Sequence, residues 1–452
     1  MSDNNGNQQD GLNPIKDEQR PMSLWSYIPV WWSGMIVVMI FAVGFFAINP
    51  NGPLNVNQAI VALALASLVC GVIFALNAFP GYLEGVPFAA QARSSFGVKG
   101  ANIATIARSI PAICWLGIAT WAGGVAINTI TQTLWGFGNS YVYFILFLIL
   151  NVILALGGAR FMKVFNTVAG WFLVGLMTIT MIIVLRSGAL EAYKAIPFKG
   201  SWWGYGFWAV FAAGGACIIT GALNISDMSR LLVKSKGSRN NWIGHILGIA
   251  PAYFYMLFLG IIFGMATGNP DPIAAMVKLS PTIAMGIAVL IFVLFAQISS
   301  NLTLNILASA HGIQNLSPKL SWKTGVIISA VISLFTFPWI LFTSANYYRF
   351  MNVYSCFLGP ILGITLADYW IVNRRQTDVK ALYDMQKGGK YWYKNGFSIA
   401  AIITLVIGGV VSLLAIDFSW MVGAPVGFVL YIVLKEVVGV DRIRESSTFH
   451  KV

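Results

Sequence analysis

Residues 26–48 read SYIPVWWSGMIVVMIFAVGFFAI and contain no charged side chain. A helix needs about 20 mostly apolar residues to cross the hydrocarbon core of a bilayer, so this stretch predicts a membrane-spanning helix. The pair Ser33-Gly34 lies about a third of the way along it. We expect the helix to be broken at this pair, because helices that line the midplane of many secondary transporters are discontinuous.

Most of the chain is similarly apolar. Of its 452 residues, 58% are hydrophobic and only 10% are charged, whereas soluble proteins carry about 25% charged residues. This composition excludes a soluble globular enzyme or a nucleic-acid-binding module, and it predicts an all-α polytopic membrane protein. Twelve apolar windows are candidate membrane spans: 26–48, 57–79, 101–130, 141–157, 164–185, 206–225, 243–266, 282–310, 323–343, 350–372, 397–416 and 419–435.

Two windows share a feature that predicts internal symmetry. Gly214-Gly215 occupies a place in the sixth window that corresponds to Ser33-Gly34 in the first, and each pair opens a block of five windows of similar length. Inverted repeats of this kind are common in secondary transporters. The alternative is that glycine, present 45 times, is simply frequent in membrane helices. The expected organisation is a disordered cytoplasmic tail (1–24), a first five-helix repeat (25–186), an extracytoplasmic loop (187–205), a second, inverted five-helix repeat (206–372), a cytoplasmic loop (373–396), two further helices (397–435) and a cytoplasmic tail (436–452).

The basic residues predict the orientation in the membrane. If the N-terminus is cytoplasmic, the inner loops hold sixteen of the 28 Lys and Arg residues and the outer loops hold five. The positive-inside rule therefore places both termini in the cytoplasm, in the inner membrane if the cell is bacterial, and it explains the net charge of +13 without nucleic acid as a partner. All four cysteines, Cys70, Cys114, Cys217 and Cys356, lie in apolar stretches and predict buried thiols rather than disulfides.

One window is unusually polar. The run FAQISSNLTLNILAS (295–309) contains Gln297, Ser299, Ser300, Asn301, Thr303 and Asn305. On a helix, Gln297, Asn301 and Asn305 form one stripe and the hydroxyl residues another. Such residues can serve as hydrogen-bonding glue between helices, but packing rarely needs six of them in nine positions. Hydroxyls and carbonyls are hard oxygen donors suited to a small cation, so Ser299 and Ser300 beside the break at Ser33-Gly34 predict a sodium site.

Titratable groups are scarce in the predicted membrane region. Of the 15 acidic residues only Asp368 falls within a window, while Asp227 lies just past the 206–225 window. A proton relay needs a titratable group in its path, so their scarcity favours sodium as the coupling ion. His245 and His311 stand at span ends, where we expect satisfied interfacial side chains. The sequence has no metal-ligand cluster, phosphate-binding loop or nucleophile motif, so we expect neither an enzyme nor any cofactor besides the ion.

Tryptophans in the third window predict a ligand platform. The run CWLGIATWAGG (114–124) holds Trp115 and Trp121. A membrane tryptophan is most often an interfacial anchor, yet Trp115 lies near the middle of its window, where a flat side chain can stack on a planar ligand.

Several of these stretches together resemble the nucleobase:cation symporter-1 family, which carries nucleobases, hydantoins, allantoin and related vitamins. The resemblance covers nearly the whole chain and is closest to the bacterial allantoin and hydantoin permease branch. The stretches that carry it are YIPVWWSG, RSSFGVKGAN, CWLGIATWAGG, ALNISDMSR, SSNLTLN and LGPILGITLADYWIVNRR.

The resemblance implies a twelve-helix inverted-repeat fold with alternating access, and it implies two sites. The sodium ligands it implies are Ser33, Ile36, Ala296, Ser299 and Ser300. The substrate would stack on Trp115, lie against position 218 and hydrogen-bond to Asn305, with Cys217 and Asn301 as further candidate contacts. Partners are then a small heterocycle, sodium and the lipid bilayer.

Three positions depart from the family pattern. Val37 stands where hydantoin-type members tend to have an amide, Ala119 where they have a glutamine, and Ile218 where they have a second aromatic. Each missing amide leaves a ligand's polar edge unpaired, at a cost of about 1 to 3 kcal/mol. We therefore expect a wider, more apolar pocket for a larger or less polar heterocycle, such as a vitamin precursor or a substituted pyrimidine. Two alternatives to a sodium symporter remain, a proton-coupled permease and a membrane receptor that has lost transport.

Overall fold

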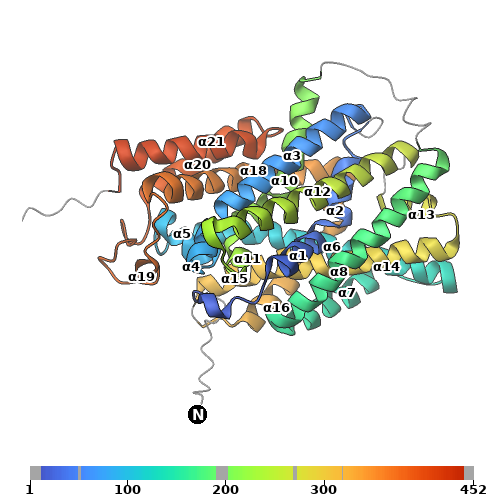
Figure 1. The fold of residues 1–452 in the computed structure, drawn as a ribbon, viewed down its shortest axis with the longest axis horizontal. Helices are drawn as coiled ribbons and strands as arrows, with labels where there is room; N and C mark the ends of the chain where they lie inside the picture. The colour runs from blue at the N-terminus through green and yellow to red at the C-terminus, as the bar shows by residue number, and fades with distance from the viewer. Residues whose placement is uncertain (1–11, 49–51, 190–201, 268–271, 318, 442–452) are drawn as a thin grey trace, which may run out of the picture.

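The structure is a computed structural model that describes residues 12–48, 52–189, 202–267, 272–317 and 319–441. Over these ranges the chain forms helices and no sheet, and strand-like contacts are limited to isolated bridges such as Met22 with Leu232. Figure 1 shows the helices packed into one bundle. The helices are α1 (Leu24–Met35), α2 (Val38–Phe45), α3 (Val56–Asn77), α4 (Phe79–Glu84), α5 (Phe88–Phe96), α6 (Ala101–Trp135), α7 (Ser140–Leu156), α8 (Gly158–Val184), α10 (Tyr205–Leu223), α11 (Ser226–Ser229), α12 (Arg239–Thr267), α13 (Pro272–Lys278), α14 (Ile283–Ser300), η4 (Asn301–Asn305), α15 (Ile306–Leu316), α16 (Trp322–Ser333), α17 (Pro338–Leu341), α18 (Ser344–Ala367), η5 (Asp368–Val372), α19 (Val379–Leu382), α20 (Ile399–Leu414), α21 (Ser419–Ile432) and η6 (Val433–Val437).

Length and hydropathy identify the helices that can cross a membrane. Seven of the described helices are long and apolar enough, and the bent pair α1 and α2 is an eighth candidate. Shorter apolar helices fill further predicted windows: Ser140–Leu156, Val164–Leu176, Trp322–Ser333 and Ile399–Leu414. The predicted all-α polytopic architecture is confirmed for the described residues.

Several helices begin at a polar cap, and α7 also carries apolar side chains outward. Asn139, for example, accepts the backbone N–H groups of Tyr141 (2.9 Å) and Val142 (3.3 Å) at the start of α7, which satisfies donors that the first turn leaves unpaired. On the outer side of α7, Ile149 and Ile153 remain exposed. A helix that is apolar on every side is typical of a membrane span.

The first window is broken, but not where the sequence predicts. α1 and α2 meet at 58°, and the break lies at Ile36 (φ −85°, ψ 77°) and Val37 (φ −140°, ψ 153°). Ser33 and Gly34, the predicted break, stay helical. In an unbroken α-helix the Val37 N–H would donate to Ser33 O. It donates instead to Met35 O (3.0 Å). β-branched Ile36 and Val37 favour extended backbone, and the Ser33 carbonyl is left for another donor.

The predicted break in the sixth window is wrong. Gly214 and Gly215 lie within the continuous helix α10, and the chain leaves helical geometry only at Asn224. The glycines instead allow close packing, since a Cβ on Gly215 would lie 2.2 Å from Trp420 Cζ2. The Trp420 indole N–H also donates to Ala212 O (2.8 Å), so α21 packs closely against α10.

α18 and α21 pack backbone against backbone at one edge of the bundle (Figure 1). Each carries two glycines four residues apart, Gly359 and Gly363 on α18, and Gly423 and Gly427 on α21. A Cβ on Gly363 would lie only 2.1 Å from Ala424 O. Small residues at this spacing let membrane helices approach closely, and the two helices form one tightly packed unit.

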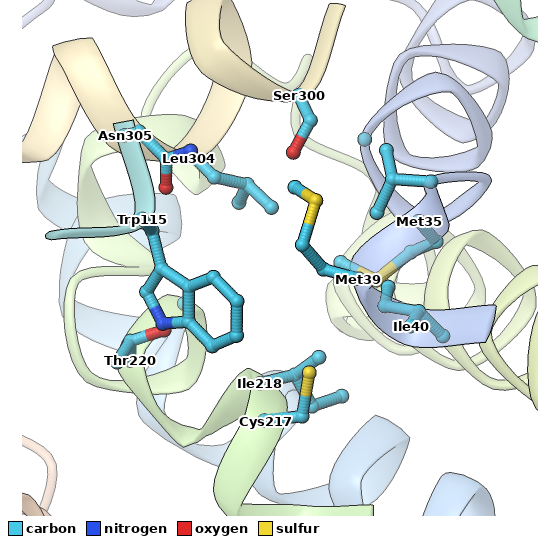
Figure 2. A pocket seen from close by; sticks show the side chains of 13 residues that line it. Met35, Met39, Ile40, Trp115, Cys217, Ile218, Thr220, Ser300, Leu304 and Asn305 are labelled. Atoms are coloured by element: carbon cyan, nitrogen blue, oxygen red, sulfur yellow. The ribbon is translucent and has the colours of Figure 1, made fainter. Parts of the chain in front are cut away.

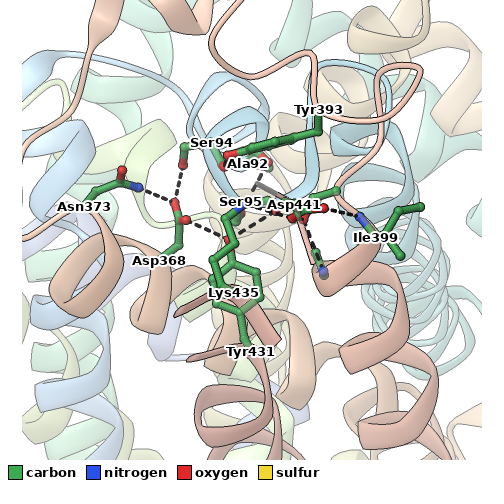
Figure 3. A network of polar contacts seen from close by, with 12 residues as sticks. Ala92, Ser94, Ser95, Asp368, Asn373, Tyr393, Ile399, Tyr431, Lys435 and Asp441 are labelled. Atoms are coloured by element: carbon green, nitrogen blue, oxygen red, sulfur yellow. Dashed lines mark hydrogen bonds and ion pairs between the residues drawn. The ribbon is translucent and has the colours of Figure 1, made fainter. Parts of the chain in front are cut away.

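Buried carboxylates join the ends of α5, α18, α20 and α21 (Figure 3). Asp368, the acid predicted within a window, accepts hydrogen bonds from Ser94 Oγ (2.6 Å), Tyr431 Oη (2.8 Å) and Asn373 Nδ2 (2.9 Å). A second carboxylate, Asp441, has three donors: Ser398 Oγ (2.6 Å), the Ile399 N–H (2.9 Å) and Lys435 Nζ (2.9 Å). With three donors each, these carboxylates act as structural anchors for the last two helices.

The segment before α1 is folded from Leu12 onward, where the sequence predicts a disordered tail over 1–24. The Arg20 side chain is buried and donates to Leu232 O (3.0 Å) and to Asp17 (3.0 Å). A buried arginine needs such partners, and they hold this segment against the chain after α11. The part of the predicted tail before Leu12 lies outside the described residues.

Candidate functional site

A cavity lies where the α1–α2 break, α6, α10 and the end of α14 meet (Figure 2). The cavity is small in this structure, with about 40 Å³ open to the centre of a water-sized sphere. Five of the seven predicted substrate contacts line it: Val37, Trp115, Cys217, Ile218 and Asn305. The remaining lining residues are Gly34, Met35, Met39, Ile40, Thr220, Gly221, Ser300 and Leu304.

Trp115 forms one wall of the cavity, opposite Met39 (Figure 2). Aromatic rings of α18 hold its indole edge to face: Phe350 at 5.3 Å between ring centroids, Tyr347 at 5.8 Å and Tyr354 at 6.4 Å. These contacts hold Trp115 in one orientation beside the cavity. Trp121 instead packs against Tyr141, Phe144 and Trp339 and does not line the cavity.

Two predicted substrate contacts do not line the cavity. Asn301 lies behind Asn305 and accepts the Asn305 Nδ2 hydrogen bond (2.9 Å) on its own side-chain oxygen. Ala119 is fully buried one turn beyond Trp115 on α6, but it is not a lining residue either. Both follow from position: Asn305 stands between Asn301 and the cavity, and the alanine side chain is too short to reach it.

Oxygen atoms from α1 and α14 converge beside the cavity. The Ser299 hydroxyl donates to Ser33 O (2.7 Å) and lies 3.1 Å from Ala296 O. The Ser33 carbonyl is the one freed by the break, and all three residues are fully buried. Two carbonyls and a hydroxyl are a donor set suited to a monovalent cation, so three of the five predicted sodium ligands lie within contact of one another.

The other two predicted sodium ligands lie at the edges of this group. Ser300 directs its hydroxyl into the cavity (Figure 2), although it follows Ser299 in the chain. Ile36 lies at the break itself, where its carbonyl belongs to the non-helical backbone. Consecutive serines thus face two different sites, the oxygen cluster and the cavity.

Sequence reasoning missed Asn166 on α8. Its Nδ2 donates to Thr303 Oγ1 (2.8 Å), and Thr303 donates in turn to Ser299 O (2.8 Å). The Asn166 side-chain oxygen is buried and has no hydrogen-bond partner among the described residues. An asparagine within an apolar window was the available signal, because such a residue is costly in lipid and usually faces the bundle interior.

A second missed residue is Arg108, two turns before Trp115 on α6. Its Nε donates to Asn224 Oδ1 (2.8 Å) and its Nη2 to Leu304 O (3.2 Å). The side chain is buried, and Nη1 has no partner within the described ranges. Arg108 therefore joins the end of α10 to the helix that carries Asn305. A cation inside a predicted span was the signal for it.

The predicted span-end histidines both lie at helix contacts. His245 Nε2 lies 2.8 Å from the Tyr27 hydroxyl and its Nδ1 lies 2.7 Å from Asn241 O, so both ring nitrogens have partners. His311 Nδ1 lies 3.6 Å from an Asp227 carboxylate oxygen, beyond hydrogen-bond distance. Among the described residues, no group of three His, Cys, Asp or Glu side chains is placed to hold a metal.

The chain is similar to known permeases over nearly its whole length. The family described as "Permease for cytosine/purines, uracil, thiamine, allantoin" matches residues 14–439. The chain is 29% identical to the allantoin permease of Bacillus subtilis (strain 168), over 94% of this chain and 92% of that protein. It is 26% identical to the hydantoin permease of Microbacterium maritypicum, over 93% and 87%.

A solved structure has the same fold. Mhp1, a nucleobase-cation-symport-1 family transporter in a closed conformation with bromovinylhydantoin bound, superposes with a TM-score of 0.84 at 26% identity. The match covers 95% of this chain and 96% of Mhp1.

Proposed function

Because the chain belongs to the family of permeases for cytosine/purines, uracil, thiamine and allantoin, we propose that it is a symporter that carries a planar nitrogen heterocycle together with sodium. One observation carries the proposal: Ser299 and Ser300 are adjacent, yet Ser299 meets the Ser33 and Ala296 carbonyls while Ser300 lines the cavity that holds Trp115 and Asn305. A single turn of helix thus serves both sites.

The proposed topology has twelve spans, with two inverted five-helix repeats, two extra helices and both termini in the cytoplasm. It is supported by the apolar helices, which occupy the twelve predicted windows, and by the excess of basic residues in the predicted inner loops. Alternating access would then expose the cavity to each side of the membrane in turn.

Sodium would be held by Ser33, Ile36, Ala296, Ser299 and Ser300. A bound cation supplies positive charge that neutral oxygens can coordinate without a titratable group. These oxygens come from both sides of the α1–α14 contact, so they hold α14 against the broken helix when they share a ligand. Since Gly34 and Ser300 also line the cavity, the same contact shapes one wall of the substrate site, which is the physical basis for coupling.

The substrate would lie on Trp115 with a polar edge toward Asn305. Among the lining residues, Asn305 contributes an amide, and the hydroxyl groups come from Thr220 and Ser300. Val37 and Ile218 line it without offering hydrogen bonds, so a ligand as rich in amides as allantoin would leave several groups unpaired. We therefore favour a larger or less polar heterocycle.

A thermal-shift screen tests the proposal. Hydantoins, allantoin, pyrimidines, purines and thiamine-type heterocycles are added to the purified protein with and without sodium, because a ligand that binds the folded state raises its apparent stability. We expect one class to stabilise the protein only when sodium is present. Ser299→Ala should weaken this sodium dependence more than Ser300→Ala, and Ser329→Ala, which removes a buried hydroxyl bonded to Gly325 O (2.8 Å) on α16, should leave it unchanged.

Transport itself decides between the coupling ions. Uptake into proteoliposomes should follow an imposed sodium gradient. Sodium-independent uptake driven by a pH gradient alone would establish the proton-coupled alternative, and binding without uptake under either gradient would establish the receptor alternative.

A further inference from the structure

Behind Asn305 lies a chain of buried polar side chains that do not line the cavity. Asn305 Nδ2 donates to Asn301 Oδ1 (2.9 Å), and Asn301 Nδ2 donates to Asn151 Oδ1 on α7 (3.2 Å). Asn301 Nδ2 also lies 3.4 Å from the Thr120 hydroxyl oxygen on α6. The chain thus crosses from the cavity through the π-helical turn η4 to two neighbouring helices.

Each branch of this chain ends on a backbone carbonyl. Asn151 Nδ2 donates to Phe147 O (2.8 Å), and the Thr120 hydroxyl donates to Leu116 O (2.6 Å). A carbonyl oxygen can only accept, so the group that faces it must be the donor. Asn151 therefore has to turn its oxygen toward Asn301, and the Thr120 oxygen is left as an acceptor.

The direction of every later bond follows from these two ends. Asn301 faces two acceptors, so it must present its NH₂ group to them and its oxygen to Asn305. Asn305 must then present its NH₂ group to Asn301, which turns its own oxygen away from the chain. Figure 2 shows that oxygen directed toward Trp115.

Burial makes this orientation hard to reverse. Asn151, Asn301 and Thr120 are fully buried, and Asn305 is 5% exposed. Without water to replace them, turning any one amide around places two donors or two acceptors face to face and leaves buried polar groups unpaired. In the wide turn η4, where the Ile306 N–H bonds to Asn301 O, Asn301 and Asn305 lie one above the other and remain in contact.

We infer that Asn151 and Thr120 are positioning residues that set the polarity of the substrate site, so that Asn305 offers a fixed hydrogen-bond acceptor and the cavity selects heterocycles with an unsubstituted N–H at that edge. The hydroxyls of Thr220 and Ser300 can rotate to donate or accept, but the Asn305 amide cannot. This inference rests on the proposed function and specifies which edge of the heterocycle is recognised.

The test compares each stabilising heterocycle from the thermal-shift screen with its N-methylated analogues, which cannot donate at the methylated nitrogen. Wild type should prefer the N–H form of one position by about tenfold or more in Kd, the effect of one lost hydrogen bond to a buried acceptor. In Asn151→Leu/Thr120→Val, where both ends of the chain are removed, this preference should fall to about twofold. Thr120→Ser should retain it.

The controls separate positioning from packing. Thr129→Val removes a hydroxyl on α6 whose hydrogen bond, among the described residues, goes to Val125 O (2.9 Å) within its own helix, and it should leave the preference unchanged. If Asn151→Leu/Thr120→Val fails to fold, Asn151→Leu alone, which removes the closer of the two acceptors of Asn301 Nδ2 (3.2 Å against 3.4 Å), should still lower the preference. A uniform loss of affinity for N–H and N-methyl forms with an unchanged ratio overturns the inference. The absence of any stabilising heterocycle in wild type overturns the proposed function itself.

Discussion

Replacing Trp115 tests the assignment of the cavity most directly. The indole is held edge to face by Tyr347, Phe350 and Tyr354 of α18, so its position does not depend on the ligand. A planar heterocycle entering the cavity meets this side chain as the only aromatic ring among the lining residues. Val37 and Ile218 on the other walls offer contact but no stacking.

The magnitude follows from this arrangement. Stacking of a base-like ring on an aromatic side chain contributes about 1 to 3 kcal/mol, which corresponds to a Kd raised by about 5- to 160-fold in Trp115→Ala. We expect the upper half of this range, because Ile218 cannot supply a second aromatic face. Trp115→Phe keeps a ring of smaller area at the same place, and the loss should stay below about tenfold.

Binding is measured by titration of the stabilising heterocycle against the purified variants at saturating sodium. Trp121→Ala is the matched control, because Trp121 is also a tryptophan of α6 with three aromatic neighbours, Tyr141, Phe144 and Trp339, but lies outside the cavity. It should lower the melting temperature without changing Kd by more than about twofold. Equal effects of the two alanine variants on Kd, or an unaffected Trp115→Ala, would refute the stacking role.

Three further predictions concern polarity around the two sites. Val37→Gln/Ala119→Gln should weaken binding of the native heterocycle and strengthen binding of allantoin in competitive uptake, because the native ligand leaves the new buried amides unpaired and allantoin satisfies them. A double variant that still prefers the native substrate by the wild-type margin, or a wild type that already prefers allantoin, would contradict this prediction. Arg108→Leu should reduce transport more than equilibrium binding, since Arg108 does not line the cavity and its bonds to Asn224 and to Leu304 O join the end of α10 to η4; a purely binding defect in paired uptake and titration experiments would contradict it. Asn166→Leu should raise the sodium concentration that gives half-maximal thermal stabilisation severalfold, by releasing Thr303 from its place beside Ser299, and an unchanged sodium titration would show that α8 has no part in the cation site.

The membrane architecture could be predicted from the sequence, because burial in lipid requires long apolar helices wherever the chain crosses. The exact place of the first break could not. Ser33-Gly34 looks permissive, but the backbone departs from the helix at β-branched Ile36 and Val37. The carbonyl that the break frees, Ser33 O, is paired by Ser299 of α14, a contact that local sequence does not reveal.

The glycine pair of α10 shows a second limit. A glycine pair such as Gly214-Gly215 can mark a helix break, but here it allows close packing against Trp420, more than two hundred positions later in the chain. Which neighbour approaches a glycine is a property of the tertiary structure, so local sequence cannot tell a hinge from a contact surface.

The polar residues of the site were partly predictable. The helical stripe correctly placed Asn301 and Asn305 on one face, but the stripe does not reveal that Asn301 lies behind Asn305 and not beside it. Asn151 and Thr120 lie on other helices, α7 and α6. Their side chains come within hydrogen-bond distance of Asn301 only because those helices pack against η4.

The tight packing of α18 on α21 has a mechanical consequence. Trp115 packs against aromatic rings of α18. α18 in turn packs closely against α21 at its glycines, and Trp420 of α21 packs against Gly215 and donates to Ala212 O of α10. A displacement of α18 that loosens Trp115 must therefore move α20 and α21 together with it. A fluorophore on the exposed rim of α20, for instance at Val406, would register heterocycle binding from outside the cavity, without any label touching the transport path.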